Sequence, residues 1–464
     1  MSIIAILLIV YIFYILITEN KRESLIKIFT LYCIFSTFVT TGYFIKLGNV
    51  VITFSQILSV VIFLFYSLNF SKDFKRMIIE RDKRILIILI FFIVIIFNIT
   101  KLFLFSKSVM VMPNSIADVK VSEVVQAEFT MDTIQKSISL FMFIIVTTFT
   151  SYIIDEELWN KIKKRYISFG RFMIIYCLFE FLYNNIVSNN NLIKFVTFIF
   201  GDTGSQYTRL VKRGGIFCIQ GFNKEPSHVA IAFLILQVII LLSKDLASVK
   251  KTLHSVLIVS IMIFSGAFTG ALCAVISVII YIVTLKKIQM INCIVGIGIL
   301  FLILLGIGIS VKNSLLQYYL MRVGNFLGIL KYAYPAMNKN DALLKVQNIQ
   351  YYFSNGGNSG SEYIRLSSIL YNLDLFYQNI LLGVGLGATN AQGMIPSILA
   401  NIGIIGSFLW SKVIFYGKSI KGITNKLILI IIIGSLFFIG DIGWLFNISI
   451  IMLVYSIRYY EKVK

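Results

Sequence analysis

The sequence has few of the residues on which metal centres and disulfide frameworks depend. Only two of its 464 residues are histidine, His228 and His254, so one chain cannot form a multi-histidine metal site. The five cysteines are scattered, and four of them lie inside apolar runs, which offers neither a disulfide framework nor a thiolate metal cage. Charged residues make up only 14% of the chain, too few for an ordinary water-facing surface.

Apolar residues are abundant instead. Hydrophobic residues account for 58% of the chain, and its mean hydropathy is +0.88. This excess excludes a disordered chain and indicates a protein that lies in a membrane. About thirteen segments have the length and apolarity that a spanning helix needs. They cover residues 2–18, 25–45, 50–70, 85–105, 138–154, 167–187, 227–243, 255–266, 269–285, 290–311, 394–416, 427–440 and 442–457.

The predicted fold is therefore all-α, a single polytopic membrane domain over residues 1–464 with about 12–13 transmembrane helices. Two apolar stretches are too long for one span, and we divide them at the glycine-bearing turns SGAFTG and GDIGW. Lys101 and Arg171 lie close enough to span ends to extend toward the interface. Glu180 lies deeper, and it either faces an internal cavity or has a hydrogen-bonded packing role.

The net charge of +21 is distributed in a way that predicts orientation. Clusters of lysine and arginine occupy alternate connections, at 72–84, 161–165, 244–251, 286–287, 418–426 and 458–464. Cytoplasmic loops carry such clusters. All six fall on one side if the N-terminus is outside and the C-terminus is cytoplasmic, which is the topology we predict.

Three long segments then remain on the outer face, at 106–137, 188–226 and 312–393. The last two are basic, although basic residues usually concentrate in cytoplasmic loops; long loops are exempt from that tendency. They are either solvated loop surface or an outward-facing site for an anion. The 312–393 loop also has helical apolar spacing on both sides of SNGGNSGS, which predicts amphipathic helices on the outer membrane surface, with Arg365, Ser368 and Asn372 on the polar face of the second.

The segment RLVKRGGIFCIQGFNKEPSH combines cations with a possible base just before a span. Pro226 suits the first turn of a helix, which makes Glu225 its approximate N-cap. Glu225 is then either a plain capping acid or a general base among cations, and His228 is the alternative base, or an interfacial packing residue. The cations here are Arg209, Lys212, Arg213 and Lys224.

Arg365 and the glycines of GVGLG form a second constellation. No strand precedes these glycines, so a dinucleotide-binding loop is excluded. Gly383, Gly385 and Gly387 more simply let the chain turn back toward the membrane, while Arg365 can bind two phosphate oxygens. The outer loops contain no Asp-x-Asp motif, which weighs against a metal-bridged diphosphate.

At these two constellations the chain resembles the Wzy-type polysaccharide polymerases, which share a fold with the O-antigen ligases. The matching features are GGIFCIQGFNKEPSHVAIAF entering a helix, a long outer loop, and RLSSILYNLDLFYQNILLGVGLG followed by a span with Asn401, Gly403 and Gly406. The resemblance covers roughly residues 165 to 410. By position, Arg365 matches the arginine of the long loop, and Glu225 and Pro226 match the Glu-Pro that opens a span.

The resemblance implies a membrane glycosyltransferase that acts on the outer face of a bacterial cytoplasmic membrane. Its donor and acceptor would be polyprenyl-diphosphate-linked oligosaccharides, with chain-length regulators and flippases as candidate partners. We expect no cofactor, no metal and no nucleic acid. Glu225, His228 and Arg365 are the catalytic candidates, and the diphosphate-binding candidates are Arg209, Lys212, Arg213, Lys224 and Arg365.

Two other functions stay open. A ligase would differ in its acceptor, but the His-Asn that ligases carry before the following span is replaced here by ATNAQG at 388–393, which favours a polymerase. A flippase or other transporter would have short outer loops and charges at the membrane midplane, whereas this sequence has long outer loops.

The predicted topology can be tested by labelling. A cysteine at Ser205, on a background lacking Cys218, should react with an impermeant thiol reagent in intact cells, because residues 188–226 are predicted to be outside. Labelling that requires cell lysis would contradict this orientation.

Overall fold

The computed structural model describes most of the helical core and parts of the connections. The described residues are 1–40, 42–47, 50–80, 82–105, 110–111, 125–127, 129, 131–187, 191–201, 212–213, 215–223, 225–243, 245–284, 317–321, 324, 361–389, 393–415, 423–437 and 452–457. Within them the chain is mainly helical, as predicted. The predicted span 290–311 and most of 442–457 lie outside these residues.

The helices follow the predicted apolar segments closely. They are α1 (Ile3–Thr18), α2 (Lys21–Thr37), α3 (Phe54–Asn69), α4 (Ser71–Ile79), α5 (Lys83–Phe105), α6 (Met131–Ile153), α7 (Glu156–Val187), α8 (Asn191–Phe200), α9 (Pro226–Leu241), α10 (Ser248–Phe264), α11 (Phe268–Thr284), α15 (Ser361–Gln378), α16 (Met394–Phe415) and α17 (Ile423–Ser435). Three antiparallel hairpins pair β1 (Ile45–Leu47) with β2 (Val50–Ile52), β3 (Met110–Val111) with β4 (Val125–Gln126), and β5 (Lys212–Arg213) with β6 (Ile216–Phe217).

Several helices have the length and composition of membrane spans. Among the described residues, α5, α6, α7 and α16 qualify, and a fifth span results if α3 and α4, bent by 79°, are counted as one. Helices α1, α9 and α11 are apolar but shorter, at 16 or 17 residues. These helices indicate a membrane protein.

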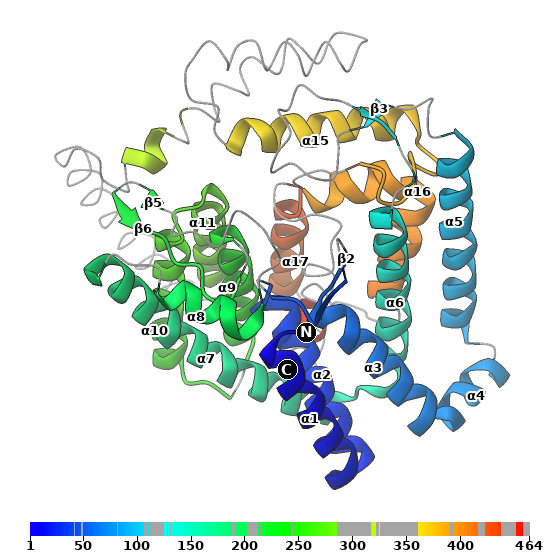
Figure 1. The fold of residues 1–464 in the computed structure, drawn as a ribbon, viewed down its shortest axis with the longest axis horizontal. Helices are drawn as coiled ribbons and strands as arrows, with labels where there is room; N and C mark the ends of the chain where they lie inside the picture. Colours follow the sequence, from blue (N-terminus) through cyan, green and yellow to red (C-terminus); the bar gives the residue numbers. More distant parts are fainter. Residues whose placement is uncertain are drawn as a thin grey trace.

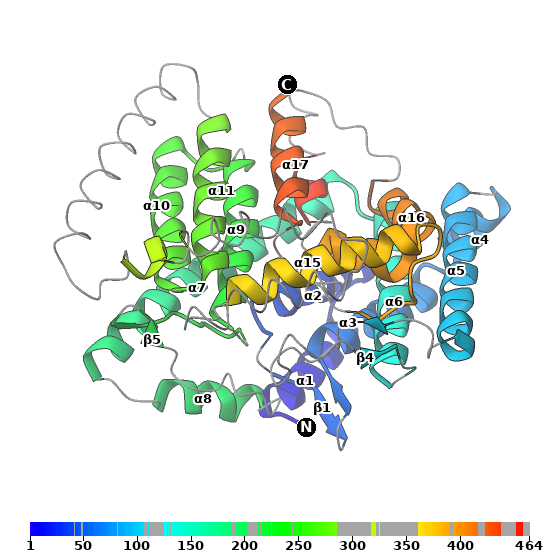
Figure 2. The ribbon, with the colours of Figure 1, turned by 90° about the horizontal axis from the view of Figure 1, so that it is seen from above.

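The helices form two groups joined by α2 and α3 (Figure 1). In one group α9 packs against α7, α10 and α11; in the other α16 packs against α5 and α6. Helix α2 contacts α7, and α3 contacts both α2 and α6, so the two helices connect the groups. Helix α15 runs across one side of the molecule and packs on α16 (Figure 2). The core centres on α9, which is buried along nearly its whole length.

Two details of the predicted spans are wrong. The segment 25–45 stops being helical after Thr37, because the backbone N–H groups of Thr40 and Tyr43 donate instead to the carbonyls of Phe222 and Phe200. The 188–226 loop contains α8, a ten-residue apolar helix that we predicted as loop.

The division at SGAFTG is confirmed, since α10 ends at Phe264 and α11 begins at Phe268. The division at GDIGW lies outside the described residues.

Helix α15 confirms the predicted helix but not its polar face. Ser368 and Asn372 are fully buried, whereas Tyr377 is 75% exposed. Two of the predicted polar-face residues, Ser368 and Asn372, therefore lie against the protein, and the position of this helix on the membrane surface stays a prediction. Asn372 can be buried because its side-chain Nδ2 donates to the Ser368 carbonyl, one turn earlier in α15, at 2.8 Å.

Helix α16 is broken at Gly403, whose φ of 63° and ψ of −169° only glycine adopts readily. The segment 380–385 fits into the break. The carbonyls of Ala400 and Asn401 accept the N–H groups of Val384 and Gly385, and the N–H groups of Ile404 and Ile405 donate to the carbonyls of Ile380 and Leu381. Four backbone groups at the break thus have partners in the inserted segment, which an apolar environment favours.

The glycines and Lys101 hold the inserted segment in place. Gly383, Gly385 and Gly387 all have positive φ, which confirms that GVGLG turns the chain back toward the next helix. Lys101 Nζ donates to the Gly383 carbonyl at 2.7 Å and to Asn379 Oδ1 at 3.3 Å. Lys101 therefore binds the inserted loop, and its extension toward the membrane interface stays a prediction.

The break predicts a large difference between two glycine-to-alanine substitutions. A Cβ at Gly403 would lie 2.4 Å from the Leu381 carbonyl oxygen in a backbone conformation unfavourable to alanine, so Gly403→Ala should destabilise the fold by about 2 kcal/mol or more. Gly434→Ala, in α17 with nothing within 4 Å, should be neutral or slightly stabilising. Thermal unfolding of the detergent-purified proteins measures both. Equal stabilities for Gly403→Ala and wild type would contradict the break.

Candidate functional site

The segment from Lys212 to Phe217 forms a hairpin that is fastened to α7. The side-chain amide of Asn185 in α7 pairs with the backbone of Phe217, as a neighbouring strand would. Nδ2 donates to the Phe217 carbonyl at 3.1 Å, and Oδ1 accepts the Phe217 N–H at 3.0 Å. Two residues later the N–H of Ile219 donates to the carbonyl of Phe264, at the end of α10. The hairpin that carries two of the predicted cations is therefore fixed to two helices.

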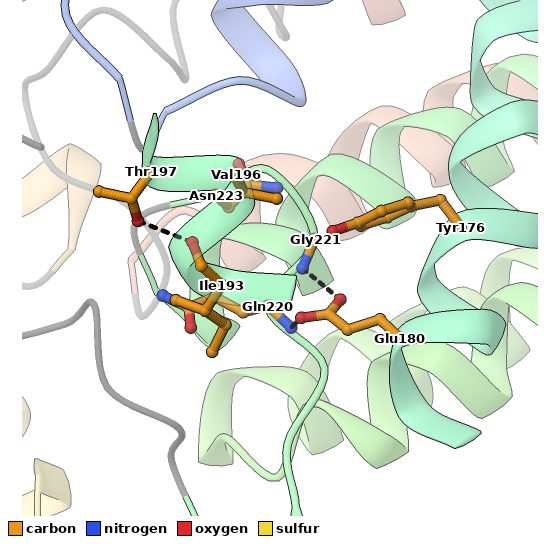
Figure 3. A pocket seen from close by; sticks show the side chains of 8 residues that line it. All are labelled: Tyr176, Glu180, Ile193, Val196, Thr197, Gln220, Gly221 and Asn223. Atoms are coloured by element: carbon orange, nitrogen blue, oxygen red, sulfur yellow. Dashed lines mark hydrogen bonds between the residues drawn. The ribbon is translucent and has the colours of Figure 1, made fainter. Parts of the chain in front are cut away.

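Glu180 fixes the next part of the segment. Its side chain is 1% exposed, and its two carboxylate oxygens accept the backbone N–H groups of Gln220, at 3.2 Å, and of Gly221, at 2.7 Å (Figure 3). Gly221 has a φ of +61°, which allows this tight turn. Both sequence-based alternatives for Glu180 hold, because it packs by hydrogen bonding and also lines a pocket.

Glu225 stands at the N-cap of α9 with Pro226 in the first turn, as predicted. Its side chain makes no capping hydrogen bond. Glu225 Oε2 instead accepts a hydrogen bond from the Ser227 hydroxyl at 3.0 Å. The carboxylate is half-buried and forms no hydrogen bond with the free backbone N–H groups at the start of α9. The geometry therefore disfavours the first alternative, a residue that only caps the helix.

His228 belongs to a short chain of polar side chains. Thr40, just after α2, lies with its hydroxyl 3.3 Å from His228 Nδ1 and 3.2 Å from Asn223 Oδ1, to which it donates. The N–H of Thr40 also donates to the Phe222 carbonyl. The start of α9, the turn at 220–223 and the end of α2 are thereby held together, and His228 is connected to the turn that Glu180 binds.

The predicted cations are only partly within the described residues. Lys212 is exposed, with its Nζ 5.3 Å from the ring centre of Phe217, and Arg213 donates to the Gly266 carbonyl at 3.1 Å. The structure thus brings Lys212 and Arg213 onto the hairpin that leads to Glu180 and Glu225. Arg209 and Lys224 lie outside the described residues, and Arg365 is placed in α15 by its backbone alone.

A pocket lies between α7, α8 and the 220–223 turn (Figure 3). Its free volume is about 10 Å³, close to that of one water molecule, and its lining residues are Tyr176, Glu180, Ile193, Val196, Thr197, Gln220, Gly221 and Asn223. Sequence reasoning did not identify this pocket or Tyr176 and Asn223. A signal was present in the second half of α7, where Tyr176, Glu180 and Asn184 recur every four residues and so share one face.

The charges on α7 are arranged differently at its two ends. Near its start, Glu23 of α2 accepts hydrogen bonds from Lys161 and Arg165 at 3.0 and 3.1 Å, and the bond from Lys161 is the main reason that the pKa of Glu23 lies below its usual value. Near its other end, none of the ion pairs among the described residues includes Glu180. The same residues contain no group of three or more metal-ligating side chains.

Comparison with protein-family models, with curated proteins and with solved structures finds no match to this chain.

The geometry predicts that Glu225→Gln separates activity from stability. Because Glu225 makes no cap bond, the variant should unfold within about 0.5 kcal/mol of wild type, whereas loss of a true cap would cost about 1 kcal/mol. If the carboxylate takes the acceptor proton, turnover should fall roughly 100-fold with little change in donor binding. Glu157→Gln, at the exposed start of α7, is the control. Wild-type turnover in Glu225→Gln would remove this residue from the chemistry.

Proposed function

We propose that the chain is a membrane glycosyltransferase of the Wzy type, which polymerises polyprenyl-diphosphate-linked oligosaccharides on the outer face of the bacterial cytoplasmic membrane. In this proposal the N-terminus is outside, the C-terminus is cytoplasmic, and about 12–13 helices span the bilayer. The active site lies where the 188–226 and 312–393 loops meet the helix bundle.

One observation carries the proposal: the attachment of the segment from 212 to 228 to two helices, α7 and α10. Asn185, Glu180 and the Phe264 carbonyl hold this segment, and it leads directly into α9, the most buried helix. Two cations, Lys212 and Arg213, and two candidate bases, Glu225 and His228, are thus gathered in one stretch at the mouth of an apolar bundle. A reaction between a lipid-anchored diphosphate and a sugar hydroxyl needs these groups at such a boundary.

The chemistry follows from the charges of the reactants. An acceptor hydroxyl attacks the anomeric carbon of the donor, forming a new carbon–oxygen bond, while the bond from that carbon to the lipid diphosphate breaks. The diphosphate leaves with the bonding electron pair, and Arg209, Lys212, Arg213, Lys224 and Arg365 neutralise its charge. Glu225 or His228 takes the proton of the acceptor hydroxyl.

The broken helix α16 bears on the transporter alternative. Transporters use the free backbone groups of such breaks to bind substrate or ions. Here the groups at Ala400, Asn401, Ile404 and Ile405 are all bonded to the 380–385 segment. The break is thus filled by the protein itself, which favours a transferase over a flippase. A ligase would use the same donor chemistry and remains the nearest alternative.

Polymer formation by the purified protein tests the proposal. Detergent-purified protein given a synthetic polyprenyl-diphosphate-linked repeat unit should produce a ladder of lipid-linked oligomers, and should do so in EDTA, because cationic side chains would neutralise the leaving group. A ladder that appears only after Mg²⁺ or Mn²⁺ is restored would contradict the metal-independent mechanism. Absence of any oligomer from correctly folded protein would contradict the polymerase.

In the same assay Arg365 should behave as a bidentate phosphate ligand. Arg365→Lys keeps the charge but loses the planar fork, so its activity should fall nearly as far as that of Arg365→Ala, by about 2 kcal/mol or more in transition-state stabilisation. Lys339→Ala, in the same loop, should retain wild-type activity. Wild-type rates for Arg365→Ala would end the proposed role of this arginine.

A further inference from the structure

The pocket beside Glu180 contains a donor and an acceptor that the protein leaves available. Asn223 is 1% exposed and its Oδ1 is bonded to Thr40, but Nδ2 has no partner among the described residues. Glu180 accepts one backbone N–H on each oxygen, and each oxygen retains a further lone pair. A buried donor without a partner is costly, so Asn223 Nδ2 favours a group in the pocket that can accept its hydrogen bond.

The pairing of these two groups selects the kind of ligand. A cation would approach the carboxylate but would be repelled by the hydrogens of the Asn223 amide. A diphosphate can only accept hydrogen bonds, so it would be disfavoured by the acceptor oxygens of Glu180 beside the Asn223 amide. A neutral hydroxyl satisfies both, because it can donate to Glu180 and accept from Asn223 at once.

The size of the pocket agrees with a single hydroxyl. Its free volume is about 10 Å³, so one hydroxyl of a ligand can reach Glu180 and Asn223 while the rest of the ligand stays outside. Beside it, the Tyr176 ring centre is 4.5 Å from that of Phe222, which in turn is 5.1 Å from that of Phe200. The Thr40 hydroxyl also connects Asn223 to His228, a candidate base of the proposed reaction.

We propose that this pocket is an acceptor subsite, in which Glu180 and Asn223 hold one hydroxyl of the acceptor sugar while a neighbouring hydroxyl is presented for transfer. The inference rests on the proposed transferase function and adds which substrate binds where. Glu180 and Asn223 are positioning residues here, and the cations serve the donor diphosphate. The pocket therefore selects a hydroxyl by hydrogen bonding, whereas the donor diphosphate is bound by charge.

Acceptor and donor kinetics of the purified full chain test the subsite. Asn223→Ala removes the Nδ2 donor, and Asn223→Asp removes it while keeping the Oδ1 bond to Thr40. Each should raise KM for the acceptor roughly ten-fold or more while KM for the donor changes less than about two-fold. Asn98→Ala is the matched control, because Asn98 in α5 is also fully buried with an unpartnered side-chain oxygen but lies outside the pocket. Unchanged acceptor KM in both Asn223 variants, or equal effects on donor and acceptor, would overturn the subsite.

A binding measurement distinguishes failure of the subsite from failure of the transferase proposal. The probe is the free repeat-unit oligosaccharide, released by mild acid from its lipid carrier, with saturation-transfer NMR as the readout. Wild type and Asn98→Ala should bind it, and both Asn223 variants should bind it roughly ten-fold more weakly. Equal binding by all four proteins, or no binding by wild-type protein that still forms polymer, would overturn the subsite and leave the transferase standing. Wild-type protein that neither binds nor polymerises would overturn both.

Discussion

The carboxylate of Glu180 accepts two backbone N–H groups inside an otherwise apolar bundle, and the geometry of the candidate site depends on this contact. Without it the N–H groups of Gln220 and Gly221 would be buried unpaired, which costs about 1–3 kcal/mol for each group. The turn at 220–223 places Asn223 against Thr40 and sets the direction in which the chain enters α9. Glu225 and His228 are then positioned by backbone that Glu180 holds.

The same constraint explains the other polar side chains in the core. At three places among the described residues, a polar side chain or a neighbouring segment completes the hydrogen bonds of backbone that is not helical. Asn185 does so for the β5–β6 hairpin, Lys101 for the inserted loop, and the 380–385 segment for the break at Gly403. The hairpin and the inserted loop belong to the two constellations identified in the sequence. In the proposed function, one of these places binds the acceptor and cations of the outer loops bind the donor.

Much of the fold could be predicted from the sequence, because apolar runs and glycine-bearing turns are local signals. The helices, the turn at SGAFTG and the N-cap position of Glu225 are examples. What could not be predicted depends on contacts between distant segments. Helix α2 ends early because Phe200 and Phe222 supply partners for its next residues, and Ser368 and Asn372 turn inward because α15 packs on α16. The pocket combines α7, α8 and the 220–223 turn, and no periodicity within one segment could show that combination.

Chain-length analysis of the surface polysaccharide in a strain lacking this protein tests the central claim most directly. If the protein joins lipid-linked repeat units on the outer face of the membrane, the strain should carry single repeat units on the final acceptor, and the wild-type chain should restore the polymer. Lipid-linked polymer that accumulates without transfer would show that the protein is a ligase. Lipid-linked units that remain on the cytoplasmic face would show that it is a flippase, and either result would contradict the account.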